Sequence, residues 1–349
     1  MRRLRLGIVG YGYWGSKHVR VARSLPDVEL VIIEQHLDRM AAAAEAFPDV
    51  EIVVDLDQVI ADLDAVIIAT APTSHGHLAR RFLESGVHVL VEKPLATTTA
   101  EGMELVQIAE ANDLVLMVGH TFEYNPSVQM LREMILNGDL GELRYIDTAR
   151  LNLGMYQSDV NVIWDLAPHD ISITNYLLDS QADHVSAWAR SNVISQTEDV
   201  AYLQLEYTEP SINSYINVSW LNPQKVRRVT VVGSEKMVIY NDVDVNEPIR
   251  VYDMGIDLGE ESVTPERPVI YRYGDIWSPR VNGREPLLVE DEHFIECIRT
   301  GERPQSDGLS GLTVVNTIET AVQSCLGGGI RLPIPRAGAE PLQGVLAMP

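Results

Sequence analysis

The sequence contains only two cysteines, Cys297 and Cys325, among its 349 residues. Two thiols in helical-looking segments form neither a disulfide framework nor the clustered ligand spacing of a metal site. We therefore predict two buried free thiols, no bound metal, and a reducing compartment such as the cytoplasm.

Basic residues are also scarce, with 27 Lys and Arg against 50 Asp and Glu and a formal net charge of -23. Nucleic-acid binding depends on neutralising phosphates, so a general nucleic-acid role is excluded. The acidic residues are spread along the chain, which indicates a solvated surface and still allows a local cationic pocket for an anionic ligand.

Long apolar runs are absent as well. No run approaches the roughly 18 residues that a membrane helix needs, so no membrane partner is expected. The start, MRRLRLGIVG, has basic residues before an apolar run, but glycines interrupt that run at once. A signal peptide is therefore rejected.

Short apolar runs alternate with amphipathic stretches from the start of the chain to His120. This alternation is typical of βαβ units around a parallel sheet with both faces covered. The predicted strands are residues 3–10, 28–34, 51–54, 64–70, 87–94 and 114–120, and the predicted helices are residues 14–25, 38–47, 75–86 and 99–113.

The pattern changes after this region. Apolar and polar residues alternate in 201–207 and 211–220, which predicts a half-covered, mostly antiparallel sheet. A hairpin is expected over 225–242, and helices over 169–179 and 291–301. The fold class is thus α/β, with a doubly wound first domain at 1–122, a second α/β domain with a large open sheet at 123–335, and a tail at 336–349.

Three glycines in the stretch GIVGYGYWG have the spacing G-x-G-x-x-G directly after the first predicted strand. In this context Gly10 allows a tight turn, Gly12 lets the backbone approach a pyrophosphate, and Gly15 lets helix and strand pack closely. The helix N-terminus adds free N–H groups and a positive dipole end. The alternative is a structural turn that binds nothing.

An acidic residue about 20 positions after the glycines would bind the ribose hydroxyls and favour NAD. Glu34 takes this role if the second strand ends one residue early. Otherwise Gln35, with His36 and Arg39 nearby, could accommodate the extra phosphate of NADP. The choice stays open with a preference for NAD.

Lys93 lies in the sequence EKP at the end of a predicted parallel strand. Ligands of open parallel sheets bind outside the carboxyl ends of the strands. A lysine there can bind a hydroxyl and stabilise an alkoxide as charge develops. The alternative is an ordinary surface lysine.

Asp165 and His169, in WDLAPHD, are four residues apart, so one helical face would carry both. A carboxylate and an imidazole form a plausible proton-handling pair. Pro168 is tolerable if the helix begins near Leu166 or Ala167, because proline fits the first turn. Alternatively, Asp165 caps the helix and His169 has no chemical role.

The glycine loop, ATAPTSH at 69–75, VEKPLA at 91–96 and the Asp-x-x-x-His-Asp stretch occur in this order. Together they resemble the Gfo/Idh/MocA oxidoreductases, which include glucose–fructose oxidoreductase and inositol dehydrogenases. The resemblance covers about residues 4 to 330, and HTFEYNPSV and HFIECIRTGERPQSDG are similar to a branch associated with nucleotide sugars. Gln35 departs from the family, since many members have Asp there.

The resemblance implies a Rossmann domain, a nicotinamide cofactor, and hydride transfer at a ring hydroxyl of a sugar or cyclitol. It implies that Lys93, Asp165 and His169 are catalytic. His169 would take the hydroxyl proton, Lys93 would stabilise the alkoxide, and Asp165 would orient the substrate. The bond between Lys93 and Pro94 is often cis in relatives.

The remaining site residues are expected around these three. We predict cofactor contacts from Gly10, Gly12, Tyr13, Trp14, Gly15, Glu34, Gln35, Thr70, Pro72, His75, Glu92 and Lys93. We predict substrate contacts from Tyr124, Asn125, Gln157, Asp159, Asn161 and His169. His120 could also face the same cleft.

The function predicted from this resemblance is an NAD(P)-dependent dehydrogenase of a sugar, preferably nucleotide-linked, with C3 as the carbon of the reacting hydroxyl. One alternative is a cyclitol dehydrogenase, or a redox-neutral enzyme that recycles its bound cofactor. Another is a sensor that kept the fold and lost catalysis. Relatives usually pair through the open sheet, which implies a homodimer or homotetramer.

Overall fold

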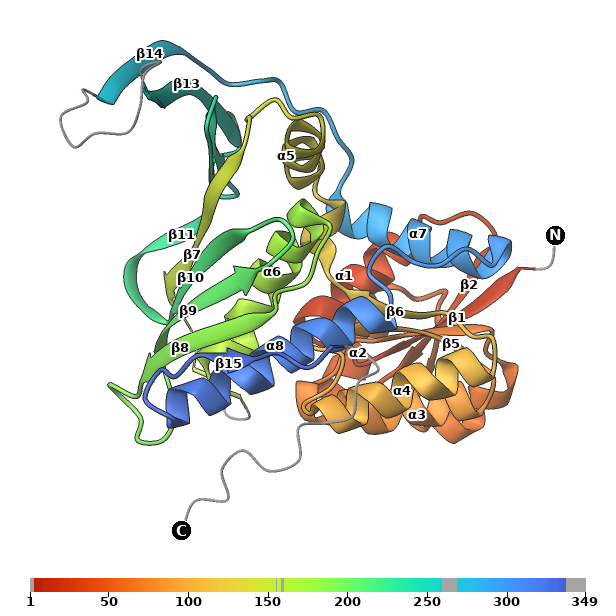
Figure 1. Ribbon diagram of the computed structural model, residues 1–349. Coiled ribbons are helices and arrows are strands. Elements are labelled where there is room, and N and C mark those ends of the chain that lie inside the picture. Colours follow the sequence, from red (N-terminus) through yellow and green to blue (C-terminus); the bar gives the residue numbers. More distant parts are fainter. Residues whose placement is uncertain (1–2, 155, 158–159, 259–268, 337–349) are drawn as a thin grey trace. The chain divides into compact units, whose positions relative to one another are not determined.

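The computed structural model describes residues 3–154, 156–157, 160–258 and 269–336. Contacts divide the chain into two compact units (Figure 1). The first comprises the chain up to Tyr124, Arg284–Glu319 and the described residues from Pro335. The second comprises residues 125–283 and 320–334.

The first unit is built on a six-stranded sheet with the order β3-β2-β1-β4-β5-β6, in which every neighbouring pair is parallel. This is the strand order of a Rossmann fold, whose order reverses between β1 and β4. The strands are β1 (Leu4–Val9), β2 (Val28–Ile33), β3 (Glu51–Val53), β4 (Ala65–Ile68), β5 (His88–Glu92) and β6 (Leu116–Gly119).

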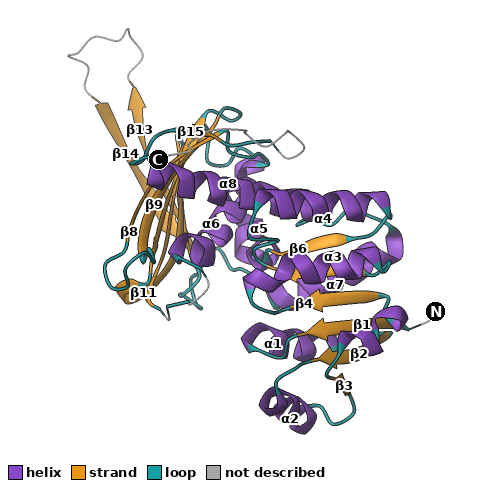
Figure 2. Ribbon diagram, turned by 90° about the horizontal axis from the view of Figure 1, so that it is seen from below, coloured by secondary structure: helices purple, strands orange, loops and turns teal. Residues whose placement is uncertain are grey.

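Helices follow the strands as the alternating pattern predicts, and Figure 2 shows them beside this sheet. They are α1 (Tyr13–Ala22), α2 (Leu37–Ala46), α3 (His75–Glu84) and α4 (Thr99–Ala111), with the short 3₁₀ helices η1 (Leu56–Gln58), η2 (Ile60–Asp62), η3 (Pro72–Ser74) and η4 (Thr121–Tyr124). Gly86, just beyond α3, has a φ of +78°, the left-handed conformation expected after a helix.

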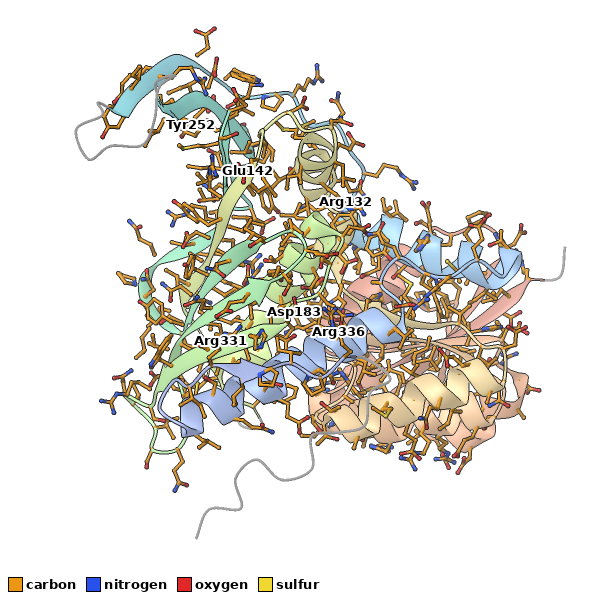
Figure 3. All side chains as sticks on the ribbon, viewed as in Figure 1. Arg132, Glu142, Asp183, Tyr252, Arg331 and Arg336 are labelled. Atoms are coloured by element: carbon orange, nitrogen blue, oxygen red, sulfur yellow. The ribbon has the colours of Figure 1, made fainter. Side chains whose placement is uncertain are left out.

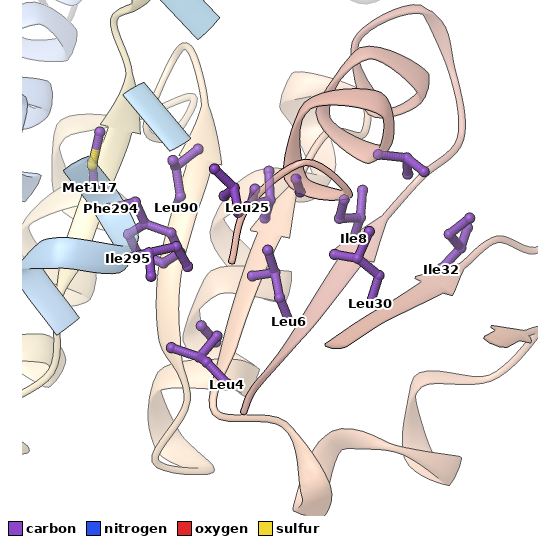
Figure 4. Close-up of a cluster of buried hydrophobic side chains, with 14 of the residues drawn as sticks. Leu4, Leu6, Ile8, Leu25, Leu30, Ile32, Leu90, Met117, Phe294 and Ile295 are labelled. Atoms are coloured by element: carbon purple, nitrogen blue, oxygen red, sulfur yellow. The ribbon is translucent and has the colours of Figure 1, made fainter. Parts of the chain in front are cut away.

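Helix α7 (Pro286–Thr300) belongs to the first unit, although the sequence placed this segment with the second domain. Figure 4 shows Phe294 and Ile295 of α7 in the same apolar cluster as Leu90 of β5. Phe294 is completely buried there. The burial of these side chains explains why a late segment of the chain returns to the first unit.

The second unit is built on a nine-stranded sheet with the order β14-β13-β12-β11-β7-β10-β9-β8-β15. Its β7–β10 pair is parallel and its other pairs are antiparallel. The strands are β7 (Leu143–Leu153), β8 (His184–Arg190), β9 (Val200–Tyr207), β10 (Ile212–Ser219), β11 (Leu221–Gly233), β12 (Met237–Asn241), β13 (Ile249–Leu258), β14 (Val269–Trp277) and β15 (Leu332–Pro333). The predicted hairpin is confirmed as β11 and β12.

The two faces of this sheet differ as the alternating pattern predicts. Ile216 and Val218 of β10 are buried on the face that packs against α6 (Val162–Leu178). Exposed aromatic rings lie on the opposite face of paired strands, from Tyr145, Trp188, Tyr202 and Tyr215.

Two further helices were not predicted from the sequence. Helix α5 (Pro126–Leu136) packs on α6 in the second unit, where Arg132 donates to Tyr176 and Asp179. At the sheet edge Arg331 pairs with Glu206, and both Arg132 and Arg331 are labelled in Figure 3. Helix α8 (Gly308–Leu326) contributes residues to both units.

The two cysteines are free thiols. Cys297 is buried as expected, whereas Cys325, near the end of α8, is partly exposed, which corrects that part of the prediction. Among the described residues, none of the helices combines the length and apolar character needed to cross a membrane.

Candidate active site

The glycine loop joins β1 to α1 with the geometry that the spacing predicts. Gly10 has a φ of +90°, a conformation that side chains other than glycine rarely adopt. Gly15 packs against the Gly10 carbonyl so closely that a Cβ would collide with it. Gly12 is the N-cap of α1 and has open space beside it, with no side chain capping the helix. This open, uncapped N-terminus fits the pyrophosphate of a dinucleotide.

Two aromatic residues begin α1 directly after the loop. Tyr13 is exposed and its ring meets that of Trp14 edge-on, with 5.6 Å between centroids. The Lys17 ammonium lies over both rings, 3.8 Å from the Tyr13 centroid and 4.5 Å from the Trp14 centroid. This cation stands one helical turn beyond the glycine loop, and direct cofactor contacts from either ring stay predictions.

Glu34 is the first residue after β2, since the strand ends at Ile33. Its buried carboxylate accepts hydrogen bonds from the backbone N–H of Tyr11 in the glycine loop, at 2.7 Å, and of His36, at 2.8 Å. A carboxylate has about four acceptor positions, so these two bonds leave capacity for a ribose hydroxyl. This placement favours the reading in which Glu34, rather than Gln35, is the acidic residue of the fingerprint.

The side chains around Glu34 that could favour NADP lie outward. Gln35 and His36 are exposed, and the nearer guanidinium nitrogen of Arg39 lies 3.9 Å from a Glu34 oxygen. A phosphate on the ribose would lie near the Glu34 carboxylate as well as Arg39, so the charge of this cation is opposed there. The local charge therefore favours NAD over NADP.

Thr70, Pro72 and His75 follow β4 at the same sheet edge. The Thr70 hydroxyl bonds with Ser74, and Pro72 opens η3. His75 is fully buried, with one ring nitrogen 2.7 Å from the Pro94 carbonyl oxygen and the other 3.1 Å from the Thr70 carbonyl oxygen. His75 thus joins two loops of this edge, and its direct contact with a cofactor stays a prediction.

Lys93 follows the end of β5, at the carboxyl edge of the parallel sheet and two strands from β1. The peptide bond to Pro94 is cis. Glu92 is buried at the strand end, and one of its oxygens accepts the Lys93 backbone N–H at 3.3 Å. Its other oxygen lies 3.1 Å from a ring nitrogen of His18 on α1.

Helix α6 carries both Asp165 and His169, but it begins earlier than the sequence suggested. Asn161 caps the helix by accepting the N–H groups of Ile163 and Trp164. Pro168 therefore lies inside the helix rather than in its first turn, and Asp165 is not the cap. The predicted helix start near Leu166 or Ala167 and the reading of Asp165 as the cap are therefore wrong, whereas the placement of Asp165 and His169 on one helix is confirmed. The chemical role of His169 stays a prediction.

Two contacts, one partly buried and one buried, hold this helix and its carboxylates in the second unit. The Trp220 indole N–H donates to an Asp165 oxygen at 3.0 Å. Asp170, next to His169, accepts two bonds from the Arg150 guanidinium, at 2.8 and 3.2 Å, and both side chains are buried. The paired contacts fix the part of α6 that carries His169.

The predicted substrate residues have mixed surroundings. Tyr124 is 4% exposed and its hydroxyl bonds with Ser306, so it packs in the core of the first unit, which argues against a direct substrate contact. Asn125 caps α5 through the Ser127 N–H. The Asn161 amide also donates to Glu198.

The other two substrate predictions precede α6 in the sequence. Gln157 is exposed there, and Asp159 lies outside the described residues. Substrate contacts from Asn125, Gln157, Asp159 and Asn161 stay predictions.

Sequence reasoning missed the buried partners of these residues. His18 stands three residues after Gly15, and its place on the inner face of an amphipathic helix was a usable signal. Asp291 and Trp220 are far from their partners in the chain and had no local signal. His120 is 2% exposed, and neither ring nitrogen has a hydrogen-bond partner among the described residues.

Comparisons with known proteins agree with this fold and motif order. Residues 4–120 match the model of the Gfo/Idh/MocA family described as an oxidoreductase family with an NAD-binding Rossmann fold, and residues 128–239 match the C-terminal domain model of the same family. The chain belongs to the Gfo/Idh/MocA oxidoreductases. Its first unit is therefore an NAD-binding Rossmann domain.

Two curated relatives illustrate the range of named substrates. UDP-N-acetylglucosamine 3-dehydrogenase from Acidithiobacillus ferrooxidans is 27% identical, over 90% of this chain and 95% of that protein. Its solved structure matches with a TM-score of 0.75 at 25% identity, over 93% and 97% of the two chains. An NADP⁺-dependent scyllo-inositol 2-dehydrogenase from Bacillus subtilis is 24% identical, over 92% and 93%.

A further structure shows the same fold. An enzyme of gentamicin A biosynthesis, solved in complex with NAD, matches with a TM-score of 0.79 at 21% identity, over 96% of this chain and 97% of that chain.

Proposed function

We propose that this protein is an NAD-dependent dehydrogenase that interconverts a ring hydroxyl and the corresponding ketone of a nucleotide-linked sugar. The observation that carries this proposal is the position of Lys93 at the carboxyl edge of the sheet that also holds the glycine loop. The similarity to a UDP-N-acetylglucosamine 3-dehydrogenase supports the substrate class and the choice of C3.

We propose that the first unit holds the cofactor and that the second unit supplies the substrate groups. The uncapped N-terminus of α1 would bind the pyrophosphate, and Glu34 would bind the ribose hydroxyls. When bound, NAD supplies the hydride acceptor for the oxidation of the alcohol.

The chain's own residues then handle the proton and the charge. In the oxidation direction, His169 takes the proton from the substrate hydroxyl at a ring nitrogen. The Lys93 ammonium donates a hydrogen bond to the oxygen as negative charge develops there. Asp165, held by the Trp220 indole, orients the substrate through its second oxygen.

The test is an assay of purified enzyme with NAD and a panel of alcohols that includes UDP-N-acetylglucosamine, other UDP-sugars, free sugars and inositols. We expect reduced nicotinamide to form fastest with a UDP-sugar. Faster turnover of a free inositol would contradict the proposed substrate class but would still support the dehydrogenase reaction. Dinucleotide binding without turnover on any alcohol would contradict the proposal and indicate a sensor.

Lys93→Ala tests the chemical role directly. Loss of a group that stabilises the developing charge should lower kcat by about 10²- to 10³-fold. Calorimetric titration with NADH should show only a small loss of affinity, because Lys93 is one of several predicted cofactor contacts and the glycine loop is intact. Lys236→Ala, which removes a lysine that donates to the Asp139 carbonyl in the second unit, is the matched control and should leave kcat unchanged. Near-normal turnover of Lys93→Ala would refute this mechanism.

We also propose that the protein forms a homodimer or homotetramer through the open face of the nine-stranded sheet. The exposed rings of Tyr145, Trp188, Tyr202 and Tyr215 on that face support an interface, because contiguous exposed apolar surface is typical of association sites. Light scattering of the wild type and of Tyr202→Glu tests it. A monomeric wild type would contradict it.

A further inference from the structure

A chain of buried ionisable groups lies directly behind Lys93, and the mechanism above does not use it. His18 of α1 is completely buried between two carboxylates. One ring nitrogen lies 3.1 Å from a Glu92 oxygen, and the other lies 3.0 and 3.2 Å from the two oxygens of Asp291 on α7. Three segments far apart in the sequence thus meet at one imidazole.

The geometry favours a doubly protonated imidazole. With both carboxyls ionised, a neutral imidazole would leave one nitrogen facing a carboxylate oxygen without a proton between them, because it has a single N–H donor. Although burial opposes the charge, Asp291 and Glu92 together raise the pKa of His18 well above its ordinary value. Burial likewise opposes the charge of Glu92, but its bond to His18 brings the pKa of Glu92 below the usual range.

Burial favours the neutral forms of the other ionisable groups around His18 and Glu92. Burial raises the pKa of Asp291, and contact with His18 works against that rise. Burial also raises the pKa of Glu290 well above its ordinary value, which favours its neutral form, and one of its oxygens accepts the Thr121 hydroxyl. Burial lowers the pKa of His120 to about 4, so that ring is uncharged. His75 also acts on Glu92, and burial lowers the pKa of His75 below its ordinary value. Among the described histidines that act on Glu92, His18 is therefore the one whose charged form is favoured, and the Lys93 ammonium is another nearby cation.

We propose that His18 and Asp291 are positioning residues for Lys93, forming an ion-pair chain Asp291–His18–Glu92 that fixes the strand end from which the catalytic ammonium projects. This inference rests on the proposed function, because it assumes that Lys93 acts on the substrate.

The contacts show how the chain reaches Lys93. The Glu92 carboxylate has one oxygen on His18 and the other on the Lys93 backbone N–H, so its orientation is set from both sides. Asp291 anchors the far side of the imidazole on α7. Loss of Asp291 frees the imidazole to turn, and the Glu92 carboxylate and the Lys93 backbone can then move together. A misplacement of about 1 Å is enough to lower turnover by on the order of 10²-fold.

A double-mutant cycle between Asp291→Asn and Lys93→Ala separates this role from simple packing. In the otherwise normal enzyme, Asp291→Asn should lower kcat by about 10- to 100-fold with little change in NADH affinity. In the Lys93→Ala enzyme it should lower the residual turnover no further, because the group that it positions is gone. Equal effects in both backgrounds, or no effect in either, would overturn the inference.

Glu285→Gln is the matched control. Glu285 forms an exposed ion pair with Arg20 that also joins α7 to α1, but it does not touch His18. We expect normal kcat and melting temperature from this variant. A loss of kcat as large as that of Asp291→Asn would show that the contact between the two helices matters and that the buried chain does not.

The pH profile gives a readout that a purely structural role would not move. Removing one of the two carboxylates lowers the pKa of His18, so the imidazole of Asp291→Asn loses its proton at a lower pH than in the wild type. The kcat of this variant should therefore fall on raising the pH, with its alkaline limb displaced to lower pH. An undisplaced limb would overturn the inference.

Nuclear magnetic resonance of the ¹⁵N-labelled imidazoles tests the chain without any substrate. The His18 signal, assigned by its absence in His18→Gln, should show two N–H groups and no titration between about pH 6 and 8. Titration near the ordinary value would overturn the inference even in an active dehydrogenase. A non-titrating His18 in a protein that turns over no alcohol would instead refute the proposed function and leave the ion-pair chain supported.

Discussion

Buried carboxylates lie next to a residue proposed to be catalytic in both units, beside Lys93 in the first and beside His169 in the second. In each place a cation balances the buried negative charge, but the two cations differ. Behind Lys93 the balancing cation is the His18 imidazolium, between Glu92 and Asp291. Beside His169 it is the Arg150 guanidinium, which binds Asp170 through two nitrogens.

The two cations differ in whether they can lose a proton. A guanidinium keeps its proton at every pH at which proteins fold, and its rigid fork matches a carboxylate. An imidazolium can lose its proton, and its charge depends on its neighbours. We therefore expect the region around Lys93 to respond to pH and the region around His169 to act as a fixed support.

The largest expected effect on stability comes from removing the buried ion pair between Arg150 and Asp170. Arg150→Met leaves the buried Asp170 carboxyl without the cation that bonds it, which should lower the free energy of unfolding by about 3–5 kcal/mol. Urea unfolding followed by circular dichroism measures this. Arg331→Met, which removes a half-exposed pair with Glu206, is the control and should cost less than about 1 kcal/mol. Equal losses in the two variants would remove the distinction between buried and exposed pairs.

The second-largest expected effect is a pH dependence of the free energy of unfolding that is caused by His120 in the first unit. Its pKa is lowered by burial from 6.5 to about 4, so the unfolded chain binds a proton that the folded chain excludes. The resulting stability is present above about pH 6.5 and is lost as the pH falls toward 4, by about 3 kcal/mol over the whole window.

The measurement is the free energy of unfolding of the wild type and of His120→Leu at several pH values. We expect the wild type to lose free energy of unfolding relative to His120→Leu as the pH falls toward 4, because the variant has no imidazole to protonate. A difference that stays constant across this window would show that His120 is protonated or exposed in the folded protein.

The smallest expected effect comes from removing the hydrogen bond between the Trp220 indole and Asp165 in the second unit. Trp220→Phe keeps an aromatic ring in place but removes the N–H that donates to Asp165. Loss of a hydrogen bond to a charged group should lower the free energy of unfolding by about 1.5–3 kcal/mol. We expect kcat to fall as well, with unchanged NADH affinity. Trp277→Phe, at a partly exposed tryptophan of β14 outside the proposed interface, should change neither quantity.

The N-terminal half of the fold could be predicted because each element has a local pattern. The apolar runs of β1, β2, β4, β5 and β6 and the helices between them occur where the sequence places them. Helix α8 was missed because its sequence is rich in β-branched residues, among them Val314, Val315 and Ile318. These three side chains are buried, so packing overrides a composition that is typical of strands.

The candidate site divides in the same way. The glycine loop, EKP and the Asp165–His169 spacing are short motifs, so their chemistry can be inferred from neighbouring residues. Whether Glu34 or Gln35 stands at the ribose-binding position of the fingerprint depends on where β2 ends. The strand ends at Ile33, and the backbone hydrogen bonds from Tyr11 and His36 favour Glu34, whose contact with the ribose stays a prediction.

The sequence by itself determined the family, the parallel sheet, and the residues proposed to touch cofactor and substrate, because each depends on local spacing along the chain. Only the tertiary structure decided which groups support them. Asp291 lies 273 residues from His18, and Trp220 lies 55 residues from Asp165. Such pairs form because a buried charge or donor needs a partner from whichever segment the packed core brings beside it, and no local pattern records that choice.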